Sequence, residues 1–138
     1  MIALGALASP GAYAAWVAEI GGQVVGHVAL QRHAFPEVTA VARQATGTTD
    51  GALAVVARLL VSPTARRRGV GRALLAAAAS AATALGLRPI IDVGTRYQPA
   101  IELYEAVGWV RVGTTTLRLP DRTTLDELVY LGPEPHAA

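Results

Sequence analysis

The stretch "SPTARRRGVGRALL", residues 62–75, places three consecutive arginines and two glycines directly before an alanine-rich segment. A glycine-rich turn that opens a helix exposes main-chain N–H groups at the positive end of the helix, where they can bind an anion. The side chains of Arg66, Arg67, Arg68 and Arg72 add positive charge around this turn. Because several amides point at one patch, the arrangement suits a diphosphate better than a single carboxylate.

Two glycines in this turn, Gly69 and Gly71, remove side-chain bulk where a ligand would approach the backbone. A basic turn can also be simply solvated, and the stretch alone does not decide between these two interpretations.

Composition excludes several classes of chemistry. All twelve basic residues are arginine, so a Walker-type phosphate loop and a Schiff-base lysine are both excluded. This usage also favours a GC-rich, bacterial genome. The chain has no cysteine, which excludes disulfides, zinc thiolates and cysteine nucleophiles. Its three histidines lie far apart in the sequence, so we expect no metal site.

Hydrophobic patterning predicts one α/β (α+β) domain over residues 1–138, with a frayed tail at 133–138. A tight Gly-Gly turn indicates a hairpin, and a continuous apolar run indicates a buried central strand. After the arginine turn, helical spacing continues to Gly86 and a second buried strand follows, which implies a right-handed parallel crossover. We predict hairpin strands at 16–20 and 24–31, an irregular loop at 34–51, and buried strands at 52–61 and 88–93.

The C-terminal third begins with a second predicted helix, which Pro99 opens and Gly108 ends. The segments "WVRVG" and "TLDELVYL" then alternate as two strands joined through Pro120. The opening segment has no basic residue before its apolar run, and the longest helical run is too short to cross a bilayer. We therefore expect a cytoplasmic protein.

Two motifs in this order resemble the GNAT superfamily of N-acetyltransferases. The first family motif, Gln/Arg-x-x-Gly-x-Gly/Ala, is matched by Arg66, Gly69 and Gly71, after a hydrophobic strand that ends with Val61 and Pro63. The second, Ala-x-x-x-Tyr-x-x-x-Gly-Phe, is matched by "AIELYEAVGW", where tryptophan replaces the phenylalanine.

The resemblance implies a GNAT-like mixed central sheet with an antiparallel N-terminal hairpin, a parallel strand–helix–strand crossover and a C-terminal hairpin. It also implies an acyltransferase of the EC 2.3.1 class, which moves an acetyl group from acetyl-CoA to a primary amine by direct attack. Acetyl-CoA is then a co-substrate, and no metal is required.

The resemblance further assigns roles to particular residues. The main-chain amides from Arg67 through Val70 to Arg72 would hold the pyrophosphate of the cofactor. The strand edge at Leu59, Leu60 and Val61 would hydrogen-bond the pantetheine arm, where the two parallel strands splay apart. Tyr104 stands where the family places a tyrosine near the sulfur, so it would act as general acid for the leaving thiolate. Tyr97 replaces an asparagine that often contacts the pantetheine or a water.

The general base stays open, because the predicted central strand contains no carboxylate. The candidates are Glu37, Asp50, His33 and an ordered water, and Asp92 on the second buried strand is a further acidic residue that could face the cleft.

The front of the chain departs from the family. Only about fifteen residues precede the first predicted hairpin strand, whereas the family begins with a strand and one or two helices. We expect the N-terminal strand and helices to be largely absent and the exposed apolar surface to favour a homodimer. Two other interpretations remain: a non-catalytic acyl-CoA-binding or regulatory module, and a nucleic-acid-binding domain that uses the arginine cluster.

Overall fold

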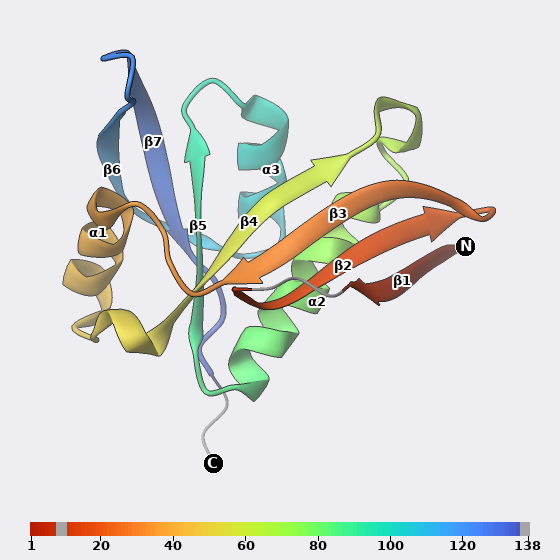
Figure 1. Cartoon of the computed structure of the whole chain (residues 1–138), viewed down its shortest axis with the longest axis horizontal. Helices are drawn as coiled ribbons and strands as arrows, with labels where there is room; N and C mark the ends of the chain where they lie inside the picture. Colours follow the sequence, from red (N-terminus) through yellow and green to blue (C-terminus); the bar gives the residue numbers. More distant parts are fainter. Residues whose placement is uncertain (8–10, 136–138) are drawn as a thin grey trace.

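The structure is a computed structural model that describes residues 1–7 and 11–135. Its centre is a seven-stranded mixed sheet in the order β1-β2-β3-β4-β5-β7-β6 (Figure 1). Among the described residues, β4 and β5 pair in parallel and all other neighbouring strands pair antiparallel. The strands are β1 (Ile2–Leu7), β2 (Ala12–Ile20), β3 (Gln23–Gln31), β4 (Leu53–Val61), β5 (Arg88–Gly94), β6 (Val110–Arg118) and β7 (Thr124–Leu131).

Within the described residues, three α-helices cover the sheet: α1 (Pro36–Thr46), α2 (Val70–Ala84) and α3 (Gln98–Ala106). Their buried side chains form two cores. In the larger core, apolar residues of α2 and α3 pack with alternate residues of β3, β4, β5 and β7. In the smaller core, Val38 and Ala42 of α1 pack with Ile90 of β5 and Val129 of β7. Because successive strand residues point to opposite faces, α1 covers the face opposite α2 and α3.

The predicted hairpins, the crossover and the mixed sheet are confirmed, but residues 34–51 are not the irregular loop that the sequence suggested. They contain α1, with Pro36 in its first turn and Gly47 at its C-terminal end in the left-handed conformation (φ 72°). The N–H of Gly47 donates to the Arg43 carbonyl. Proline and glycine therefore mark the ends of a helix here, not the interior of a loop.

The predicted absence of an N-terminal strand is also wrong. The segment "IALGAL" forms β1, which pairs with β2 from Ile2↔Ile20 to Leu7↔Ala15. Residues 8–11 alone connect these two strands, so no helix precedes β2 in the described part of the chain.

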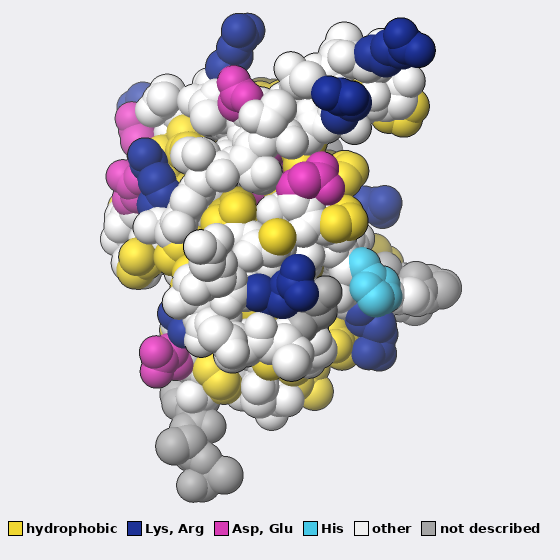
Figure 2. All heavy atoms as spheres, turned by 90° about the vertical axis from the view of Figure 1, so that its left-hand side faces the viewer, with side chains coloured by type: hydrophobic (Ala, Val, Ile, Leu, Met, Phe, Trp, Pro, Cys, Tyr) yellow, Lys and Arg dark blue, Asp and Glu magenta, His cyan; other side chains and the backbone are white. Residues whose placement is uncertain are grey.

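The helix α1 covers the C-terminal side of the sheet. It packs on β6 and β7. Figure 2 shows this side of the molecule, where hydrophobic side chains are scattered among polar and charged ones. None of the helices in the described ranges has the length and apolar character needed to cross a membrane. Of the predicted frayed tail, residues 136–138 lie outside the described residues.

Candidate functional site

The site begins where β4 and β5 separate. Their parallel pairing covers three residue pairs and ends at Val55↔Ile90. Beyond that pair, β4 continues to Val61 and β5 to Gly94, and the two strands diverge (Figure 1). Backbone groups on a strand edge without a partner strand can pair with an extended ligand that carries amides. Residues 59–61, which the sequence analysis assigned to this role, lie on the diverging part of β4.

A bulge in β4 accompanies the divergence. Ala57 pairs with Ala29 and Leu60 with His27, so two residues of β4 lie opposite one residue of β3. One of the two, Arg58, has a positive φ of 54°, which is rare for a non-glycine residue. Its carbonyl accepts a hydrogen bond from Nδ1 of His27 at 3.0 Å. Because a bulge bends its strand and increases the local twist, this one changes the direction of the last residues of β4 relative to its first residues.

The predicted phosphate turn joins β4 to α2 through a short 3-10 turn (Pro63–Ala65). Gly69 caps α2 in the left-handed conformation (φ 80°), and a Cβ placed there would meet nothing within 4 Å. Its carbonyl accepts the first helical hydrogen bond, from Ala73 N–H at 3.0 Å. The N–H groups of the first helical turn have no acceptors within the helix.

Gly71 has a different physical role. A Cβ on this residue would lie 3.2 Å from Cδ2 of Leu103 and 3.7 Å from Cγ2 of Val61. The missing side chain thus lets the first turn of α2 pack closely against α3 and β4. The expected ligand contact at Gly71 stays a prediction.

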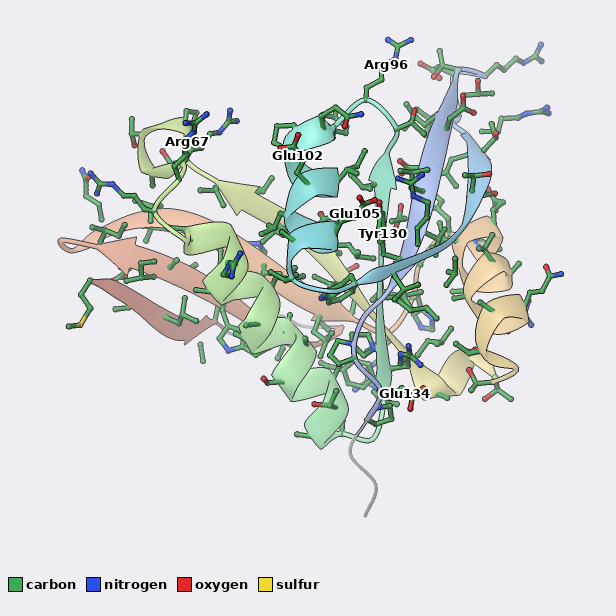
Figure 3. The ribbon with its side chains drawn as sticks, turned by 180° about the vertical axis from the view of Figure 1, so that it is seen from behind. Arg67, Arg96, Glu102, Glu105, Tyr130 and Glu134 are labelled. Atoms are coloured by element: carbon green, nitrogen blue, oxygen red, sulfur yellow. The ribbon has the colours of Figure 1, made fainter. Side chains whose placement is uncertain are left out.

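The arginines of the turn are available to a ligand. Arg66, Arg67, Arg68 and Arg72 are all exposed. Figure 3 shows Arg67 on the β4–α2 loop and Arg96 on the β5–α3 loop at the same end of the molecule. Positive charge therefore lies on both sides of the open end of the diverging strands.

Tyr104 lies on α3 and its side chain is 4% exposed. Its ring packs edge-on against Tyr130, with centroids 5.7 Å apart, and lies near Trp109. Burial, followed by the charges of Asp92 and Glu127, raises the pKa of Tyr104 to about 12. No hydrogen bond to its hydroxyl is found in the described residues, although every fully buried side-chain polar atom there has a partner. The protonated hydroxyl is therefore accessible and free to donate.

A polar network fixes α3 beside this tyrosine. The Tyr130 hydroxyl donates to Oε2 of Glu105 at 2.6 Å, and Arg111 donates to the same carboxylate at 3.0 Å. Arg111 also donates to the Tyr130 hydroxyl. Figure 3 shows Glu105 of α3 next to Tyr130 of β7. The network ties α3 to β6 and β7 and thereby holds the neighbouring Tyr104 in place.

Two acidic residues face the opposite side of the sheet. The register pairs Asp92 with Val129 and Gly94 with Glu127, which makes the two acidic residues diagonal neighbours on one face. Val129 belongs to the core beneath α1, so this is the α1 face. Asp92 stands two residues beyond Ile90, where pairing with β4 ends.

Glu127 is 8% exposed, which is unusual for a carboxyl group. Burial, a hydrogen bond to Asp92 and the negative charge of Asp92 raise the pKa of Glu127 to about 7. A group with this pKa both accepts and releases a proton near neutral pH. The sequence analysis did not identify Glu127, because in "TLDELVYL" it resembles any polar residue of an alternating strand.

The other predicted site residues lie as follows. Tyr97 is 68% exposed, and a Cβ on Gly94 would lie 2.9 Å from its ring and 3.4 Å from Oε2 of Glu127. Its ring is therefore next to the acidic pair. Glu37, in the first turn of α1, and His33 are exposed, and Asp50 begins a short 3-10 turn (Asp50–Ala52). No group of three or more metal-binding side chains occurs within residues 1–7 and 11–135.

Comparison with known proteins was made for sequence and for structure. No curated protein matches the chain. The chain is similar to ribosomal-protein-S18-alanine N-acetyltransferase from Escherichia coli, with 17% identity, a TM-score of 0.69 and coverage of 100% of this chain and 97% of that one. It is also similar to a phosphinothricin acetyltransferase from Sinorhizobium meliloti in complex with AcCoA, with 27% identity, a TM-score of 0.65 and coverage of 88% and 61%.

A third similar structure is the acetyltransferase of the GNAT family from Streptococcus pneumoniae, with 20% identity, a TM-score of 0.63 and coverage of 86% and 66%. The chain thus spans less than two thirds of the length of some of these proteins. The model of the acetyltransferase (GNAT) family matches residues 4–109. This match covers most of the chain and includes the diverging strands, the phosphate turn and Tyr104, and the chain therefore belongs to the GNAT family of acetyltransferases.

Proposed function

We propose that this protein transfers an acetyl group from acetyl-CoA to a primary amine. The observation that carries the proposal is the divergence of β4 and β5 after Val55↔Ile90, directly before the glycine turn that opens α2. An unpaired strand edge is therefore followed directly by a helix N-terminus. The first can pair with the amides of an extended ligand, and the second can bind its diphosphate. Support also comes from the family and from the similar Sinorhizobium enzyme, whose structure contains AcCoA.

In this proposal the cofactor lies along the diverging strands. The edge of β4 at residues 59–61 pairs with the pantetheine amides, and the main-chain amides from Arg67 to Arg72 hold the diphosphate. The side chains of Arg66, Arg67, Arg68 and Arg72 are exposed around that turn and supply the balancing charge. Tyr97 stands at the β5–α3 end of the same opening.

The chemistry is direct transfer. The amine nitrogen attacks the thioester carbonyl carbon, the carbon–sulfur bond breaks, and the thiolate leaves. Tyr104 donates a proton or hydrogen bond to the leaving sulfur, because its hydroxyl stays protonated at neutral pH and has no partner within the described residues. The amine must also lose one proton to a base or to water.

We further propose a homodimer in the cytoplasm, where acetyl-CoA is available. The edge strand β1, "IALGAL", contains no charge and no proline that would block pairing with a second strand. Light scattering tests the dimer, and a monomeric mass would contradict it.

The function is tested by two measurements on the purified protein. Acetyl-CoA should raise the melting temperature and bind in calorimetry, because a ligand of the folded state stabilises it by mass action. Thiol release with a panel of primary amines should then identify a substrate, and Tyr104→Phe should lower kcat about 100-fold or more while acetyl-CoA affinity is retained. Tight acetyl-CoA binding without turnover of any amine would instead indicate a binding module.

A further inference from the structure

We propose that Glu127, which lies diagonally beside Asp92 on the α1 face of the sheet, is the general base that takes the proton from the amine substrate on the α1 side of the diverging strands. This inference rests on the proposed function and names a second residue for its chemistry. Acetyl-CoA binding does not explain why Glu127 is nearly buried. Its carboxyl group lies on the face of the sheet opposite α2 and is paired there with a second carboxyl group, that of Asp92.

The position of the pair follows from the sheet. Asp92 lies on β5 just beyond its last pairing with β4, and Glu127 lies on β7, diagonally beside it. Both point to the α1 face, whereas Tyr104 approaches from α3 on the other face. The negative charges of both carboxyl groups also raise the pKa of Tyr104, so its hydroxyl lies within electrostatic reach of the pair. A thioester held between the diverging strands would have the acid on one side and the base on the other.

The surroundings of Glu127 keep it available as a base. Asp92 from β5 is the charged group that faces it, and Tyr104 from α3 is the other titratable group that interacts with it. On β6 the residue paired with it is Thr115, which carries no charge. The charged residues of α1, Glu37 and Arg43, are exposed and do not contribute to its shift. No arginine or histidine contributes either, so no cation holds the carboxylate in its ionised form.

This pair is suited to an ammonium substrate. When Glu127 is ionised, its negative charge beside that of Asp92 attracts the protonated amine. The ammonium N–H proton passes to a carboxylate oxygen of Glu127, and the neutral amine attacks the thioester carbon. The carbon–sulfur bond then breaks, its electron pair stays on sulfur, and the Tyr104 hydroxyl donates to that sulfur. The exposed ring of Tyr97, which lies beside Glu127 over Gly94, forms a wall for the body of the substrate.

Four proteins test the inference: the wild type, Glu127→Gln, Asp92→Asn and the control Asp126→Asn. Asp126 neighbours Glu127 in sequence, but its exposed side chain accepts a hydrogen bond from Thr116. For each protein we would measure acetyl-CoA affinity by calorimetry and the pH profile of kcat with the best amine of the panel. Carboxyl ¹³C NMR on glutamate-labelled protein would follow the titration of Glu127 without any turnover.

The wild-type kcat should fall as pH drops below about 7, because a general base must be ionised to act. Glu127→Gln should lose about 100-fold or more in kcat together with this acidic limb, and acetyl-CoA affinity should stay within about twofold. Asp92→Asn should move both the acidic limb and the NMR titration to lower pH, because it removes the neighbouring negative charge. Asp126→Asn should behave as the wild type.

The outcomes separate the two proposals. If the wild type acetylates amines and Glu127→Gln keeps its kcat and its acidic limb, the inference is overturned and the proposed function stands. If Glu127→Gln loses acetyl-CoA affinity in parallel with kcat, the role of Glu127 is structural and the inference is also overturned. If the wild type acetylates none of the amines, the proposed function fails and the inference fails with it.

Discussion

Replacing Glu127 by glutamine should stabilise the folded protein at alkaline pH and leave its stability nearly unchanged at acidic pH. The pKa of Glu127 is about 7 in the folded protein against an ordinary value of 4.5. A carboxyl group with a raised folded pKa binds its proton more tightly in the folded than in the unfolded chain. Its contribution to stability is complete below pH 4.5 and is lost as pH rises through 7, where a charge must remain buried beside Asp92.

The magnitude follows from these two values. The difference between about 7 and 4.5 corresponds to about 3 kcal/mol, at about 1.4 kcal/mol for each pH unit. At 8% exposure Glu127 is shielded from most of the solvent screening that would reduce this figure. Above pH 8 the glutamine variant should therefore gain about 3 kcal/mol of unfolding free energy, equivalent to a melting temperature roughly 10 °C higher in a chain of this length.

Thermal and urea denaturation at pH 4 and pH 8.5 measure this effect. The Asp126→Asn control should show the same stability relative to the wild type at both pH values, because Asp126 is exposed. An equal gain for Glu127→Gln at both pH values would show a packing effect without titration. The absence of any gain at pH 8.5 would refute the assignment of a raised pKa to Glu127.

Three further substitutions test other parts of the structure. Gly69→Asp should weaken acetyl-CoA binding at least 100-fold in calorimetry, because it places a negative charge beside the expected diphosphate. Gly69→Asn has a side chain of similar size that also tolerates a positive φ, and it should retain most of the affinity. Equal losses in the two variants would refute the role of charge. Val38→Ala should lower the urea unfolding free energy by about 2 kcal/mol, because Val38 is fully buried beneath α1, while the exposed Gln44→Ala should leave it unchanged. Tyr130→Phe should cost about 1 kcal/mol by denaturation and lower kcat, because it removes the hydroxyl that ties α3 to β7, and unchanged values of both would contradict that role.

The candidate site residues that depend on local chemistry could be proposed from the sequence, and their roles stay predictions. Gly69 needs a positive φ at a helix start, and Tyr104 follows its motif at helical spacing, so both are recognisable from short stretches. The parallel crossover could also be predicted from the sequence, because a buried strand, a helix and a second buried strand follow one another along the chain. These features involve neighbours in sequence or a single connection.

The acidic pair could not be found in this way. Asp92 and Glu127 are far apart in the sequence and become neighbours through the register Gly94↔Glu127 between β5 and β7. A shift of that register by one residue would turn Glu127 to the other face, and nothing within either strand alone fixes it. The helix α1 was missed for a different reason: the threonine and glycine cluster after it was interpreted as loop, whereas Val38 and Ala42 provide the apolar spacing that docks it on the sheet.

The acidic pair and Tyr104 are coupled by charge, and this coupling bears on how the reaction proceeds. The pKa of Tyr104 is about 12 because of burial first and of Asp92 and Glu127 next, so in the resting protein the phenol is a weak proton donor to a thiolate. In the proposed reaction Glu127 accepts a proton from the amine, which would neutralise one of those negative charges and make the phenol a stronger acid. Deprotonation of the nucleophile would thereby prepare the donor for the leaving group, in the order that the proposed chemistry requires. The β5–β7 register pairs Asp92 with Val129 and Gly94 with Glu127. The strand pairing that builds this half of the sheet therefore also places the two carboxyl groups whose charges act on Tyr104.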